Sequence, residues 1–113
     1  MNPVDGLVDS LIVELRRGTL VLAVLSQLDA PQYGYSLVQK LAARDAGVEA
    51  GTLYPLLRRL EKQGLLKSEW DTTDSRPRKY YVLSDGGREV YARLLQEWKS
   101  LVGQMDSLLS EVD

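Results

Sequence analysis

Positively charged side chains that could bind phosphate groups or base edges are concentrated between residues 51 and 81. This segment carries seven Lys and Arg residues against four Asp and Glu, whereas the whole chain of 113 residues has 14 against 16 and a formal net charge of −2. A phosphate backbone responds to the local field more than to the net charge of a protein. The overall acidity therefore leaves double-stranded DNA open as a partner.

The first part of this segment predicts a helix with one apolar and one basic face. At about 100° per residue, the leucines of the helix fall on one side. They are Leu53, Leu56, Leu57 and Leu60, while the opposite side carries Gly51, Pro55, Arg58, Arg59 and Lys62, with Tyr54 at the edge. A helix fits the major groove, where Arg and Lys reach phosphates and guanine edges, so this is a candidate recognition helix. Taken alone, the basic face is equally compatible with a solvated helix surface.

A basic hairpin is expected to follow this helix. Two strand-like runs, 65–70 and 78–83, flank a polar stretch at 71–77. The returning strand begins with cations around a proline, in the order Arg76, Pro77, Arg78 and Lys79. Such a hairpin beside a basic helix would add a second contact on one duplex, along the backbone or in the minor groove. The cations would also protect an edge strand from pairing with another sheet. The aromatic residues of the strands, Trp70, Tyr80 and Tyr81, are expected to pack in the protein rather than stack on bases.

Four helical segments are expected around the hairpin. Asn2 and Pro3 predict a capped helix start, and the apolar periodicity continues to residue 28, with Gly18 as a point of bending or interruption. Further helices are expected at about 35–44, from 49–52 to Gly64 (with Pro55 tolerated near the first turn), and from a Ser84 cap almost to the end. This order predicts a mainly α fold with a small β-hairpin in one compact domain. Residues 1–83 would form a winged helix-turn-helix that includes the N-terminal helix, and 84–113 a C-terminal dimerisation helix.

The last helix carries an apolar heptad repeat, the spacing of a coiled-coil seam. Its members are Tyr91, Trp98, Met105 and Val112, with Leu94, Leu101 and Leu108 three positions later. The first turns of this helix could pack on their own domain, but the C-terminal half has nothing within the chain to cover it. The repeat therefore predicts a homodimer, in which Leu7, Leu11 and Leu15 of the first helix could pack against the partner's last helix. A two-fold dimer would present two recognition helices to successive major-groove faces.

Two missing residue types remove most catalytic and metal chemistry. The chain has no His and therefore lacks the usual general base and the commonest metal ligand. It has no Cys and therefore no disulfide. No convergent pair of carboxylates stands out, so we expect no enzyme activity, no cofactor and no metal. No apolar run approaches the roughly 20 residues that span a membrane, and the first residues lack the order of a secretory signal. We expect a cytoplasmic protein with no membrane partner.

Four motifs in order resemble the PadR family of transcriptional regulators. They are Arg17-Gly18-Thr19-Leu20, Tyr33-Gly34-Tyr35, the stretch GTLYPLLRRLEKQGL at 51–65, and Arg76-Pro77-Arg78-Lys79-Tyr80-Tyr81. The resemblance covers nearly the whole chain, and its short C-terminal region is similar to the compact branch of the family. It implies a dimeric winged-helix repressor, often relieved by a small aromatic or drug-like molecule. The candidate DNA-binding residues are then Tyr35, Gly51, Thr52, Tyr54, Pro55, Arg58, Arg59, Lys62, Arg76, Arg78 and Lys79. The candidate dimer contacts are Leu7, Leu11, Tyr91, Leu94, Trp98, Leu101, Met105 and Leu108.

Trp98 has two interpretations. Tryptophans in helices are most often core packing. Trp98 also lies in the middle of the heptad seam, and the resemblance implies that an aromatic residue at this place lines a cavity for flat ligands in some relatives. Val8 and Ile12 of the first helix would then add an apolar wall around a small planar aromatic inducer.

The rival to a ligand-responsive repressor is a winged-helix module that binds another protein without sequence-specific DNA recognition. Such a module would lack clustered cations on the third helix and the hairpin.

Overall fold

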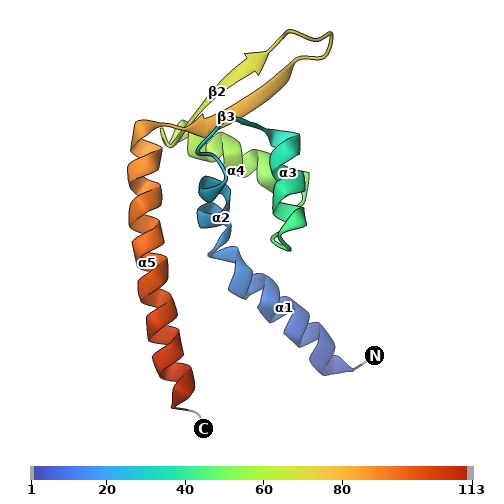
Figure 1. Ribbon diagram of the computed structural model, residues 1–113. Helices are drawn as coiled ribbons and strands as arrows, with labels where there is room; N and C mark the ends of the chain where they lie inside the picture. Colours follow the sequence, from blue (N-terminus) through green and yellow to red (C-terminus); the bar gives the residue numbers. More distant parts are fainter. Residues whose placement is uncertain (1, 112–113) are drawn as a thin grey trace.

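The computed structural model describes residues 2–111, which form five helices and three short strands (Figure 1). In chain order the elements are α1 (Pro3–Arg17), α2 (Leu20–Ser26), β1 (Gln32–Tyr33), α3 (Gly34–Ala43), α4 (Ala50–Lys62), β2 (Leu66–Asp71), β3 (Arg78–Leu83) and α5 (Asp85–Ser110). Helices α2, α3 and α4 and the base of the sheet form the body, from which α1, α5 and the outer part of the β2–β3 hairpin extend (Figure 1). The mainly α fold with a small hairpin is confirmed.

The N-terminal helical region begins and breaks where the sequence indicates. The Asn2 side chain accepts a hydrogen bond from the backbone N–H of Val4 at 2.9 Å, and the proline that follows Asn2 occupies the first turn. Gly18 and Thr19 form a turn that separates α1 from α2. α1 contains no buried residue, whereas α2 contributes fully buried side chains to the core. The two helices thus have different roles, one as a projecting arm and the other as part of the body.

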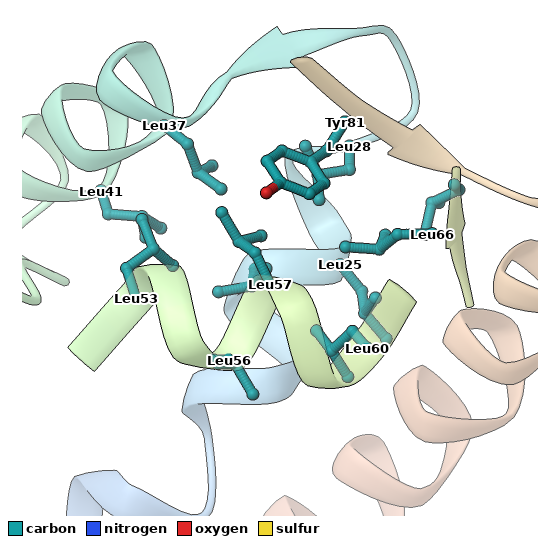
Figure 2. Packing of buried hydrophobic residues seen from close by; sticks show 12 residues of the cluster. Leu25, Leu28, Leu37, Leu41, Leu53, Leu56, Leu57, Leu60, Leu66 and Tyr81 are labelled. Carbon is teal, nitrogen blue, oxygen red and sulfur yellow. The ribbon is translucent and has the colours of Figure 1, made fainter. Parts of the chain in front are cut away.

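The core is built on the leucine face of α4. Leu53, Leu57 and Leu60 are at most 1% exposed and face the other elements of the body (Figure 2). Their neighbours in the cluster come from α2, α3, the sheet and the chain segment after α2, and include Leu25, Leu28, Leu37, Leu41, Leu66, Tyr81 and Leu83. Each fully buried side chain of this size contributes about 1.5–3 kcal/mol. This burial fixes the rotation of α4 about its axis and therefore directs its basic face to solvent.

Pro55 lies in the second turn of α4 rather than close to the first. It lacks the N–H that would otherwise bond to the carbonyl of Gly51, one turn earlier. Both residues are exposed, so water can hydrate the carbonyl that is left without its helical partner.

The sheet has three antiparallel strands in the order β1-β3-β2, one more than the sequence predicted. In the hairpin, Leu66 pairs with Leu83 and Trp70 with Lys79. The additional strand is only two residues long, and its Tyr33 pairs with Tyr80 of β3. β1 connects the start of α3 to the base of the β2–β3 hairpin, or wing.

Helix α5 is attached to the body at its N-terminal end. The Ser84 hydroxyl accepts from Gly87 N–H at 2.9 Å and donates to the Gly64 carbonyl at 2.6 Å, which confirms the predicted cap. Gly87 lies so close to the Leu65 carbonyl that a Cβ atom would overlap it. The Arg88 guanidinium binds the carboxylate of Asp29. Together these contacts set the angle at which α5 leaves the body.

Only the first part of α5 contributes to the core of its own chain. Tyr91 and Leu94 pack against the core, while the helix from Trp98 onward extends beyond the body (Figure 1). Leu101 and Leu108 remain 44% and 58% exposed. As the heptad repeat predicted, one chain cannot cover the C-terminal half of this stripe.

Candidate nucleic-acid interface

The solvent-facing side of α4 carries the cations that the sequence assigned to it. Arg58, Arg59 and Lys62 are exposed, and none of them forms an ion pair with another residue in 2–111. Gly51, Thr52 and Pro55 are exposed as well. Because the buried leucines occupy the other side of the helix, this surface can approach a groove or a phosphate backbone without any rearrangement of the core.

The two candidate tyrosines have different environments. Tyr35, near the start of α3, is 66% exposed. Tyr54 is half-buried and packs against the core, and its ring lies against Gly34, where an added Cβ atom would overlap it. Tyr54 therefore holds α3 against α4, whereas Tyr35 is free to contact a ligand.

The cations of the wing are held to different degrees. Arg76 lies at the hairpin tip, is exposed and makes no ion pair within the described part of the chain. Arg78 forms an ion pair with Asp74 at 3.0 Å, and its guanidinium carbon lies 4.5 Å from the centre of the Tyr33 ring. Exposed pairs of this kind are weak and break easily in favour of a phosphate. Both arginines therefore remain available to a nucleic acid.

Lys79 is held within the protein and is the least available of the predicted DNA-binding cations. Its ammonium lies 3.3 Å from Oε1 of Glu61 and above the rings of Trp70 and Tyr81, at 5.9 and 5.4 Å from their centres. Its side chain is only 28% exposed. The structure thus places the Lys79 side chain where the wing contacts α4.

Glu61 is a functional candidate that the sequence reasoning missed. It belongs to α4, and its carboxylate accepts hydrogen bonds from the Ser68 hydroxyl of β2 and from the Lys79 ammonium of β3. The Ser68 hydrogen bond, reinforced by Lys79, lowers the pKa of the Glu61 carboxyl below its usual 4.5. Both strands of the wing are thereby bonded to one side chain of α4. The register of the hairpin against α4, which brings these groups together, has no signal in the sequence.

A second polar contact secures the outer part of the wing. The Tyr33 hydroxyl donates to Asp71 at 2.5 Å, and Thr73 donates to the same carboxylate from its backbone N–H and its hydroxyl. The hydrogen bond from Tyr33, followed by those from Thr73, lowers the pKa of Asp71 to about 2. The same contact with the Asp71 carboxylate raises the pKa of Tyr33 above 10.0.

The expectation that all three aromatic residues of the wing are packed is wrong for Trp70. Tyr81 is 4% exposed and belongs to the core, and Tyr80 makes an edge-to-face contact with Tyr33. Trp70 is 62% exposed, because β2 and β3 continue beyond the body at this point of the ladder (Figure 1). Period-two alternation assigns a residue to a face of the sheet but does not show where that face loses its cover.

The predicted dimer and ligand residues do not form a closed site within one chain. Val8 and Ile12 belong to α1 and Trp98 to α5, and these two helices diverge along their length (Figure 1). All three side chains are at least 40% exposed. Val112, the last heptad position, lies outside the described residues.

Neither a membrane-spanning helix nor a metal-binding cluster occurs among the described residues. No helix within 2–111 is long and apolar enough to cross a membrane. In the same range, no three His, Cys, Asp or Glu side chains are grouped so that they could hold a metal ion.

The sequence profile of the transcriptional regulator PadR-like family matches residues 21–93. The chain belongs to this family. Among solved structures, a PadR family transcriptional regulator from Eggerthella lenta is 53% identical, with a TM-score of 0.89 over 94% of this chain and 95% of that one. A PadR-like regulator from Bacillus cereus is 29% identical, with a TM-score of 0.76 over 85% and 96% of the two chains. The transcriptional regulator Rv3488 of Mycobacterium tuberculosis is 40% identical over 76 residues, which are 66% of this chain and 71% of that protein.

These comparisons confirm the resemblance given by the four motifs and the winged-helix fold. The matched range 21–93 contains α3, α4 and the wing, so the candidate interface lies within the part of the chain that is shared with the family. PadR proteins are regulators of transcription rather than enzymes, which agrees with the class expected from the missing histidines and cysteines.

Proposed function

We propose that this PadR-family regulator binds double-stranded DNA as a homodimer and represses transcription from the promoters it covers. The observation that carries the proposal is the exposed face of α4, where Arg58, Arg59 and Lys62 have no ionic partner within residues 2–111. In this account α4 enters the major groove and these cations contact base edges and phosphates. The wing, with Arg76 and Arg78, follows the backbone or the neighbouring minor groove. Binding to chromosomal DNA would place the protein in the cytoplasm.

Two unpartnered apolar surfaces support the homodimer. Every apolar residue of α1 is exposed, and so is the stripe of α5 beyond Trp98. The larger exposed members are Leu7, Leu11, Leu15, Trp98, Leu101, Met105 and Leu108. Contiguous apolar patches of this extent are rare on monomers and are characteristic of interfaces between proteins. A second copy supplies a matching stripe on each helix, because a two-fold axis brings identical surfaces together.

The proposed inducer site depends on that dimer. Because α1 and α5 of one chain diverge, an apolar wall from Val8 and Ile12 would have to reach Trp98 from the partner chain (Figure 1). A planar aromatic molecule could then stack on Trp98 near the dimer axis. Such a ligand would release DNA only if it binds more tightly to a dimer whose recognition helices have the wrong spacing for the operator.

The recognition helix is tested by changing Arg58 and Arg59 together to Ala. If each residue makes a base contact or a charge-assisted phosphate contact, binding should weaken by about 2–6 kcal/mol. The matched control is Arg93→Ala, which removes an exposed arginine of α5 that is paired with Glu89 of the same helix. Gel-shift titrations at two salt concentrations measure the change. Equal affinity of the double variant and the wild type would refute the assignment of α4, and absence of any DNA binding by the wild type would favour a protein-binding module.

A further inference from the structure

A surface recess lies between the turn that follows α1 and the exposed side of α4. Its volume is about 420 Å³, and its polar lining consists of Arg17, Thr52 and Arg59. The apolar lining is provided by Leu20, Val21, Pro55 and Leu56. Arg17 is the last residue of α1, so two arginines from different helices face one recess. Neither forms an ion pair with any residue in the described range.

This recess lies on the side of α4 that is turned away from the wing. Thr52 and Arg59 are seven residues apart, two turns along one edge of the helix. Glu61, about 180° further round, is bonded to both strands of the wing. The basic face with Lys62 lies between these two edges. The recognition helix is therefore flanked by the wing on one side and by the Arg17 recess on the other.

A helix in the major groove lies between two phosphate backbones, because the groove is only about 12 Å wide. The wing can follow one of these backbones, and the recess, on the opposite side of α4, can meet the other. Two cations and a hydroxyl group around a small depression are complementary to a phosphate, whose charge and oxygen atoms they can bind together.

We propose that the recess holds a backbone phosphate of the bound duplex, with Arg17 and Arg59 as cationic contacts and Thr52 as a hydroxyl donor. The proposal rests on the DNA binding proposed above and adds a third contact to the helix and the wing. It gives a role to the Arg17-Gly18-Thr19-Leu20 motif, which neither the helix nor the wing involves. The break after Arg17 ends α1 at the edge of the recess, and Leu20, which packs against the core, fixes that position.

The decisive variant is Arg17→Gln, and Arg16→Gln is its matched control. Arg16 is also exposed and carries the same charge, but it lines only the neighbouring recess and not this one. Affinity for a duplex of random sequence is measured at 50 and 200 mM salt. One phosphate contact accounts for about 3.5-fold of the affinity lost over this fourfold change in salt. Between 50 and 200 mM salt, the affinity of Arg17→Gln for DNA should therefore fall by a factor about 3.5 times smaller than that of the wild type. The affinity of Arg16→Gln should fall by the same factor as that of the wild type.

A second variant tests the hydroxyl group without altering charge. Thr52→Val keeps the size of the side chain, and should weaken binding about 3- to 10-fold with an unchanged salt dependence. Wild-type affinity in Thr52→Val, or equal flattening of the salt dependence by Arg16→Gln and Arg17→Gln, would overturn the site. If the Arg58/Arg59 double variant loses DNA affinity while Arg17→Gln keeps it, the assignment of the recess as a phosphate site is wrong and that of α4 as the recognition helix is supported. If the wild type binds no DNA, the proposed function itself is refuted.

Two other occupants of the recess are separated by further measurements. If the wild type sediments as a dimer and Arg17→Gln as a monomer, the recess belongs to the protein–protein interface and the proposal is overturned. Inorganic phosphate is the probe for a free anion site. If phosphate raises the Tm of the wild type but not that of Arg17→Gln, and both bind DNA equally well, the recess is a free-anion site and not a DNA contact.

Discussion

Glu61 allows a test of how the wing is positioned, because charge and geometry predict opposite results for the same substitution. Its carboxylate accepts hydrogen bonds from the Ser68 hydroxyl and, at 3.3 Å, from the Lys79 ammonium. Glu61→Gln keeps the shape and one acceptor oxygen but removes the charge. If Glu61 were only a negative charge near DNA, its removal would strengthen binding. If it orients the wing against α4, its removal should weaken binding.

The expected loss of stability follows from the exposure of the pair. Hydrogen bonds to charged groups contribute about 1.5–3 kcal/mol when well formed and shielded from water. The Glu61 and Lys79 side chains are 33% and 28% exposed, so solvent screening reduces that contribution. We expect Glu61→Gln to lower the free energy of unfolding by about 1 kcal/mol, which corresponds to about 4 °C in Tm for a domain of this size. Protein concentration must be held constant, because association also shifts Tm.

The pKa of Glu61 gives the test a pH dependence with a definite sign. The folded pKa lies below the ordinary value of 4.5, so the stabilisation is present above that value and is lost as the pH falls through the folded pKa. The difference in Tm between wild type and Glu61→Gln should therefore be full at pH 7 and shrink below pH 4.5.

The matched control for Glu61 is Glu49→Gln, and the assays are thermal unfolding and gel shift. Glu49 carries the same charge at the N-cap of α4, where its side chain makes no capping hydrogen bond. Glu49→Gln should change the free energy of unfolding by only a few tenths of a kcal/mol. It should bind DNA slightly more tightly than the wild type. If Glu61→Gln behaves like Glu49→Gln in both assays, Glu61 does not position the wing.

Three further predictions concern the dimer, the wing and the ligand site. The double variant Leu101→Asp/Leu108→Asp should sediment as monomers or unfolded chains, because charges in the seam are desolvated. The control Ser107→Asp, on the other side of α5, should stay dimeric, and the same behaviour of the double variant and the control would contradict the seam. The Tm of the wild type should fall as the pH falls from 3.8 to about 2, where Asp71 loses its stabilising charge, and as the pH rises above 10, where Tyr33 ionises. Tyr33→Phe should reduce both changes, and a pH profile of Tm identical to that of the wild type would refute the contact. In a Trp70→Phe background, a planar aromatic ligand should alter Trp98 emission with micromolar affinity. Calorimetry should show that Trp98→Ala loses this affinity, whereas equal binding by both proteins places the pocket elsewhere.

The elements of this fold could be predicted because their signals are local. The cap at Asn2, the leucine spacing of α4 and the cap at Ser84 each depend on residues within a few positions, and all three were confirmed. The rotation of α4 was predictable for the same reason, since the side with the leucines must be buried and the opposite side with Arg58 and Arg59 exposed.

The features that were missed depend on contacts between distant segments. β1 is a strand only because Tyr33 pairs with Tyr80, and two residues are too few for a periodic signal. Lys79 seemed a free cation in the sequence, but the packing of the wing on α4 brings it to Glu61. The recess beside Arg17 likewise results from the way the end of α1 and the start of α2 lie against α4, whose lining residues are 31 or more positions further along the chain.

Selection of binding sites from a random duplex library tests whether a symmetric dimer reads DNA with two copies of α4. Two recognition helices related by a two-fold axis contact half-sites about one helical turn, or 10 base pairs, apart. The wild type should enrich an inverted repeat with this spacing or a multiple of it, and the Arg58/Arg59 double alanine variant should enrich none. Enrichment of a single unrepeated site, or no enrichment by the wild type, would contradict it.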